Sequence, residues 1–243
     1  MKSTLKLSLL ILAALPALFT SCKKEDTKPQ VIEYKQPSIA DRQTIVDVPS
    51  GLNTLADQGD MNALTASIYI EMANGISQFG SDFYIPSDAE RQSGDQNSAN
   101  YFWTYAGYSY WMTYKKESDK YVWTWDWETP EVQRFTYIKA EESLDGKSGN
   151  WSIYDPEASS QTVWTYNWSL DANGNFTASL VWNEDNATTG SFEVVDNADS
   201  SGSFIYKEDG VKTAEVNWNS DGSGTYWLMG DGSGVTGSWT AGK

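Results

Sequence analysis

A stretch of alternating aromatic residues runs Tyr121-Val122-Trp123-Thr124-Trp125-Asp126-Trp127, and a second runs Val163-Trp164-Thr165-Tyr166-Asn167-Trp168. Residues 101–105 show the same alternation of aromatic residues. Successive side chains of a β-strand point to opposite faces of the sheet. Each stretch therefore predicts a strand with one aromatic face and one more polar face, which is typical of half-buried antiparallel strands.

Turn signals separate these stretches. Asn-Gly and Asp-Gly pairs favour hairpins, because both residues tolerate positive φ. Between residues 100 and 239 the pattern predicts about eleven strands, with no second helical pattern that would allow parallel crossovers. A Gly-x-aromatic pattern recurs at irregular spacing, which favours a meander over a propeller or solenoid. The glycines of this pattern are Gly190, Gly202, Gly224 and Gly237.

One helix is expected over Asp60–Phe79. Its main apolar stripe recurs every fourth residue, with Asp60 as the cap at its start and Gly80 at its end. The stripe consists of Leu64, Ile68, Met72 and Ile76. Much of the remaining circumference is also apolar, so we expect a curved sheet to cover the helix.

These elements predict a mostly β fold. A meander must protect its edges, so we expect the antiparallel strands to close or curve strongly into a barrel or half-barrel, with the N-terminal helix packed against it. In architecture alone, this layout resembles lipocalin-type barrels and the open half-barrels of envelope lipid carriers. Residues 51–243 should form a single domain.

The composition excludes several functions. The chain carries 17 basic and 33 acidic residues, a net charge of −16, and it has one Cys and no His. An acidic chain repels nucleic acid. A single Cys rules out an internal disulfide, and the lack of His excludes Cys/His zinc sites and His-based catalysis. We expect no cofactor and no metal, and we do not expect an enzyme.

The N-terminus has the layout of a secretory signal. Lys2 and Lys6 precede an apolar run over 7–19, and Cys22 follows shortly after. The run is shorter than the ~20 residues that span a bilayer.

Phe19-Thr20-Ser21-Cys22 resembles the lipobox of bacterial lipoproteins, and the following Lys23-Lys24-Glu25-Asp26 resembles the Bacteroidetes type of that family. The resemblance implies that residues 1–21 are a signal peptide and that Cys22 is lipidated and anchors the protein in the outer membrane. The charged cluster favours the cell surface over the periplasmic face. Residues 22–50 are polar with three prolines, and we expect a flexible tether.

The aromatic stripes have two interpretations. They are either the sealed core, or the wall of a site that binds a lipid-like or glycan ligand without catalysis. The residues proposed for that wall are Trp123, Trp125, Trp164, Tyr166 and Trp168. With a sealed core, the protein would be a surface structural or adhesion protein.

Two further functions rest on weaker patterns. A glycoside hydrolase needs paired carboxylates, and Asp126 with Glu128 or Glu141 with Glu142 would supply them. Oxygen-rich turns at 171–174 and 219–223 would suit calcium, although hairpin formation explains the same residues.

Overall fold

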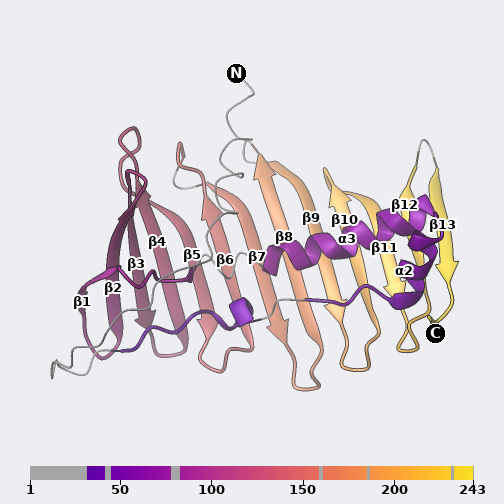
Figure 1. The fold of residues 1–243 in the computed structure, drawn as a ribbon, viewed down its shortest axis with the longest axis horizontal. Coiled ribbons are helices and arrows are strands. Elements are labelled where there is room, and N and C mark those ends of the chain that lie inside the picture. The colour runs from indigo at the N-terminus through magenta and orange to yellow at the C-terminus, as the bar shows by residue number, and fades with distance from the viewer. Residues whose placement is uncertain are drawn as a thin grey trace.

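The computed structural model describes residues 32–41, 45–77, 83–158, 161–184, 187–230 and 233–242. These residues form one antiparallel sheet of thirteen strands, each hydrogen-bonded to the next in chain order (Figure 1). The strands are β1 (Glu90–Gly94), β2 (Ser98–Tyr105), β3 (Tyr108–Lys116), β4 (Lys120–Glu128), β5 (Phe135–Ser143), β6 (Ser148–Tyr154), β7 (Thr162–Leu170), β8 (Phe176–Glu184), β9 (Ala187–Asp196), β10 (Gly202–Glu208), β11 (Val211–Trp218), β12 (Gly224–Met229) and β13 (Gly234–Trp239). The expected antiparallel meander is therefore confirmed.

The sheet is open, so of the two expected arrangements the closed barrel is wrong. Its strand order begins at β1 and ends at β13 without pairing between them, and it has thirteen strands where about eleven were expected. The alternation of aromatic and polar residues along a strand shows that one face of the sheet is buried, but it does not show which part of the chain covers that face. Here a covering layer buries that face, so closure is not needed to protect the aromatic side chains.

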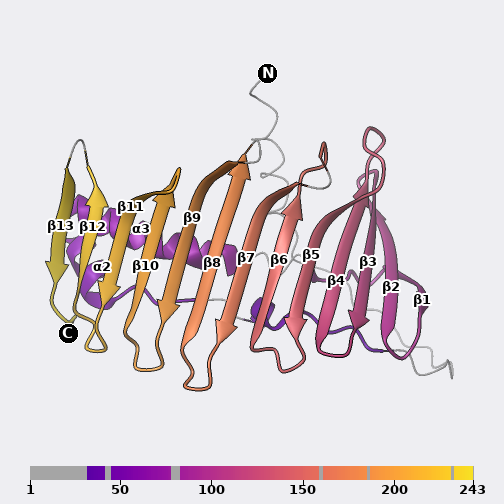
Figure 2. The ribbon, with the colours of Figure 1, turned by 180° about the vertical axis from the view of Figure 1, so that it is seen from behind.

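The covering layer consists of residues 32–41, 45–50 and 83–89 and of two α-helices, α2 (Ser50–Asp57) and α3 (Met61–Ser77). A short 3-10 helix, η1 (Ser38–Asp41), lies within its first segment. The layer crosses one face of the sheet, first toward β13 and then back toward β1 (Figure 1). None of the described segments passes over the opposite face (Figure 2). We call these the covered face and the open face.

Glycine–tryptophan pairs shape the covered face. Gly190 lies directly opposite Trp182, and Gly202 lies opposite Trp218. In each pair an added Cβ would overlap the indole ring, so only glycine leaves room for the ring to lie across the neighbouring strand. The same arrangement joins Gly149 to Trp168, Gly224 to Trp239 and Gly237 to Tyr226. These pairs give the Gly-x-aromatic pattern its structural meaning.

Helix α3 begins as expected. The Asp60 carboxylate accepts hydrogen bonds from the backbone N–H groups of Asn62 (2.9 Å) and Ala63 (3.0 Å). The expected ends at Phe79 and Gly80 lie outside the described residues. The shorter α2 was not expected.

The sheet covers one side of α3, whereas we expected it to cover much of the circumference, including the main apolar stripe. Leu64 and Ile68 are 39% and 58% exposed. The face against the sheet consists of Ala63, Ala66, Ile70 and Ala73, each 0% exposed. Small side chains let the helix axis approach the aromatic rings of the sheet, and this close approach decides which face is buried.

Part of the expected tether belongs to the domain. Ile39, Ile45 and Val46 are 2% exposed or less. Trp123 donates its indole N–H to the carbonyl of Lys35 at 2.8 Å. The buried Glu142 carboxylate accepts a hydrogen bond from the Ser38 hydroxyl at 2.7 Å. Cys22 and the rest of residues 22–31 lie outside the described residues.

Candidate functional site

The five aromatic residues predicted from the sequence do not form one wall. Trp123 and Tyr166 are 0% exposed and belong to the core, as does Trp168. Trp125 and Trp164 are half-buried. Trp123 and Trp125 lie on β4, whereas the other three residues lie on β7. Strands β5 and β6 lie between these two strands.

Trp125 instead belongs to a larger group of rings on β2–β5. We define this aromatic cluster by its continuous ring contacts. Trp127 is its centre, with ring centroids 5.2 Å from Tyr137, 5.6 Å from Phe135 and 6.0 Å from Tyr108. The complete cluster is Trp103, Tyr108, Tyr110, Trp125, Trp127, Phe135 and Tyr137.

Two backbone features bring these rings together. A two-residue turn at Ala106 and Gly107, both with positive φ (52° and 86°), folds β2 tightly onto β3. A register shift between β4 and β5 leaves Tyr137 as a bulge residue, and its ring reaches both Trp125 and Trp127. The alternation in residues 121–127 signalled the Trp residues, whereas no local pattern revealed the bulge.

The cluster lies beyond the part of the face that the covering layer buries. Trp103 is 9% exposed, and the other six rings are half-buried. The pKa of Tyr110 is raised, mainly by burial and to a smaller extent by the neighbouring Tyr108 and Tyr105. Its hydroxyl therefore remains a neutral donor. The indole N–H groups of Trp125 and Trp127 have no hydrogen-bond acceptor among the described residues. Both N–H groups are buried, so the surface that the cluster offers to a ligand is mainly the apolar area of its rings.

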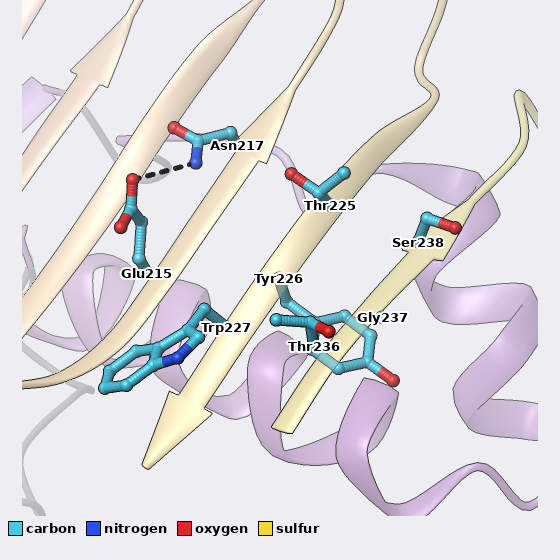
Figure 3. A pocket seen from close by; sticks show the side chains of 8 residues that line it. All are labelled: Glu215, Asn217, Thr225, Tyr226, Trp227, Thr236, Gly237 and Ser238. Atoms are coloured by element: carbon cyan, nitrogen blue, oxygen red, sulfur yellow. Dashed lines mark hydrogen bonds between the residues drawn. The ribbon is translucent and has the colours of Figure 1, made fainter. Parts of the chain in front are cut away.

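A second feature is a shallow hollow of about 480 Å³ on the open face (Figure 3). Its polar side chains form two rows across β11–β13, which are Glu215–Trp227–Thr236 and Asn217–Thr225–Ser238. Lys212 lies 4.7 Å above the centre of the Trp227 ring. The pKa of Glu215 is lowered mainly by a hydrogen bond from Lys212 and, to a smaller extent, by one from Asn217. This carboxylate is therefore charged at neutral pH.

The carboxylates proposed for hydrolysis have other roles. Glu141 and Glu142 are adjacent on β5 and point to opposite faces, so they do not flank one substrate. Glu141 pairs with Lys120 and Lys139 at 2.7 Å each, and Asp126 pairs with Arg134 at 2.7 Å.

The oxygen-rich turns bind their own backbone. Asp171 accepts hydrogen bonds from the N–H groups of Asn173 (2.8 Å) and Asn175 (2.9 Å), and Asp221 accepts one from Ser223 (2.9 Å). Their hairpin role accounts for these residues. Among the described residues, no three His, Cys, Asp or Glu side chains lie close enough together to hold a metal ion.

Neither a protein-family model nor a curated protein sequence matches this chain. Within the part of the chain that the structure describes, no helix has the length and apolar character to cross a bilayer.

Proposed function

We propose that the protein is a lipid-anchored envelope protein that binds a glycan, without catalysis, at the aromatic cluster of β2–β5. The observation that carries this proposal is that six rings of one continuous cluster remain half-buried on the covered face, whereas rings such as Trp123 and Tyr166 are sealed in the core. Sugar rings stack on the apolar faces of Trp and Tyr side chains.

The open sheet favours a glycan over a lipid-like ligand. An acyl chain needs a cavity that encloses most of its surface. In the cluster, the rings contact one another and fill the space between β2 and β5, so what they offer is an outer surface. A surface of this kind suits a sugar chain that lies across it.

Replacing one central ring tests the proposal. Trp127→Ala should weaken binding of soluble polysaccharides about tenfold, which corresponds to the loss of about 1.4 kcal/mol. Trp111→Ala is the matched control, because Trp111 lies on the neighbouring β3 but on the open face, opposite Asp126. Calorimetric titration against a panel of bacterial surface glycans gives the affinities, and circular dichroism verifies the fold of each variant.

Equal loss in both variants would assign binding elsewhere. If the unaltered chain binds no glycan of the panel, the result favours the second candidate function, that of a surface structural or adhesion protein. The complete burial of Trp123 and Tyr166 supports that alternative, because rings sealed in a core serve stability alone.

The lipid anchor is a separate part of the proposal and rests on the resemblance around Cys22. Cys22→Ala should abolish incorporation of labelled fatty acid and release the protein from the membrane fraction. Cys22 is the sole cysteine, so acylation that persists in the variant would contradict a thiol-linked anchor. Protease treatment of intact cells then distinguishes the cell surface from the periplasmic face.

A further inference from the structure

The two edges of the sheet are built differently. All five residues of β1 are exposed, with charged Glu90 and Arg91 and a register shift after Arg91. Charges and bulges of this kind prevent an edge strand from pairing with another chain. In contrast, residues 234–242 contain no charged residue and no proline, and β13 pairs with β12 without a register shift.

The unprotected edge presents backbone groups in a regular row. The N–H of Gly230 donates to the carbonyl of Ser233 at 3.2 Å, so these two residues form a hydrogen-bonded pair. Hydrogen-bonded and non-hydrogen-bonded pairs alternate along an antiparallel ladder. The backbone groups of Val235, Gly237 and Trp239 in β13 therefore form the hydrogen bonds to β12. The N–H and C=O groups of Gly234, Thr236 and Ser238 therefore point away from the sheet.

Exposed apolar side chains accompany this edge. Val235 of β13 is 40% exposed, and Met229 at the end of β12 is 48% exposed. Met61, which is 67% exposed, begins α3 over the same end of the sheet (Figure 1). In both ribbon views no described segment lies beyond β13 (Figures 1 and 2).

We propose that β13 pairs with β13 of a second copy of this chain, antiparallel and about a two-fold axis, to continue the sheet across a dimer. A register centred on Thr236 places Gly234 opposite the partner's Ser238 and Thr236 opposite its own copy. It thereby satisfies all three outward-pointing residues at once. Val235 then lies opposite the partner's Gly237, next to the Tyr226 ring that lies over that glycine.

The charge distribution identifies a second copy as the occupant. Two chains of net charge −16 repel one another over most of their surface, and the uncharged segment 234–242 lets them approach. The two-fold arrangement is closed, because each copy then presents only its protected β1 edge outward. Head-to-tail growth through β1 would meet the charges and the bulge there.

Removal of one outward N–H tests this pairing. Thr236→Pro deletes a donor that β12 does not use, whereas Thr236→Ala removes the same side chain and keeps the donor. Sedimentation of the full chain from about 1 µM to about 500 µM, where small interfaces dissociate, should show a monomer–dimer equilibrium. That equilibrium should persist in Thr236→Ala and be lost in Thr236→Pro. A full chain that is monomeric throughout this range overturns the proposal, and so does a dimer that survives Thr236→Pro.

Cysteine cross-linking tests the register. In a Cys22→Ala background, a cysteine introduced by Thr236→Cys should face its own copy at a Cα separation of about 5.5 Å, within disulfide range. Ser238→Cys, on the same edge and equally exposed, faces Gly234 and should not cross-link. Rapid disulfide formation by Thr236→Cys alone supports the two-fold pairing. Equal yields from both variants would indicate random collision and contradict the register.

Discussion

Single glycines hold the aromatic face of the sheet together. The rings of Trp168, Trp182 and Trp218 each lie across a neighbouring strand, over a glycine. Along one strand such a glycine looks like a weak point, because it lacks a side chain to pack. Across the ladder it is the space into which the large ring fits. The stability of this sheet therefore depends on residue pairs that are distant in sequence.

The same substitution should have opposite effects at two glycines. Gly224→Ala places a Cβ against the Trp239 ring and the Asn217 carbonyl, and such overpacking should cost about 1–3 kcal/mol. Gly75→Ala in α3 meets nothing within 4 Å and should stabilise the protein by about 0.5–1 kcal/mol through helix propensity. Urea unfolding measures both values. Unfolding midpoints that move in the same direction would contradict the role assigned to the glycine–tryptophan pairs.

At the scale of elements, helix α3 shows that side-chain size can outweigh hydrophobic periodicity. The every-fourth-residue stripe through Leu64 and Ile68 predicted the helix and nearly its length. Leu64 and Ile68 of this stripe are nevertheless exposed, because a helix that lies close to a sheet of Trp and Tyr rings needs small residues at the contact. Tyr69 then extends from the flank of the helix to Tyr206, with ring centroids 5.1 Å apart.

Two isoleucines of α3 should respond very differently to truncation. Ile70 is 0% exposed, so Ile70→Ala should cost about 2–5 kcal/mol, as buried large-to-small changes do. Ile68 is 58% exposed, and Ile68→Ala should change the free energy of unfolding by no more than about 0.5 kcal/mol. Denaturant titration of both variants decides the point. Comparable losses would mean that the outer face of α3 also contacts a partner surface.

Periodicity predicted most strands but not every element. The alternation in residues 121–127 is strong, because a large ring and a polar residue lie on opposite faces of a half-covered sheet. Strand β1 was missed, since Glu90–Gly94 is exposed on both faces and has no alternation to detect. The number of strands was underestimated, and the choice between a closed barrel and an open half-barrel was left undecided, because closure depends on what covers the aromatic face.

At the scale of the whole molecule, the segment formed by residues 32–41 and 45–50 determines which rings remain accessible. Apolar residues such as Ile39 and Val46 and a few hydrogen bonds, among them those of Ser38 and of the Lys35 carbonyl, attach this segment to the rest of the domain. Its path seals Trp123 and leaves Trp125 and Trp127 at the margin. The candidate site was therefore only partly predictable. The sequence marks the aromatic face, whereas the exposure of each ring depends on contacts between distant segments.

Glu142 is the strongest polar attachment of that segment to the sheet. Its buried carboxylate accepts hydrogen bonds from the Ser38 hydroxyl (2.7 Å) and backbone N–H, and from Lys35 (3.3 Å). Glu142→Ala leaves the Ser38 backbone N–H without its acceptor, although the Ser38 hydroxyl keeps the Gly146 carbonyl, so it should cost about 1–3 kcal/mol. Trypsin should then cut after Lys35, because the segment no longer lies fixed on the sheet.

The neighbouring Glu141→Ala provides the control for the attachment of residues 32–41 and 45–50. Glu141 lies on the open face and loses only its partly exposed ion pairs with Lys120 and Lys139, worth about 1 kcal/mol at most. Cleavage after Lys35 should stay as slow in this variant as in the unaltered chain. Faster cleavage in Glu142→Ala alone would locate the attachment at one carboxylate. Equal cleavage rates in all three proteins would mean that the apolar contacts of Ile39, Ile45 and Val46 suffice to hold the segment, and that the accessibility of the aromatic cluster is set by them.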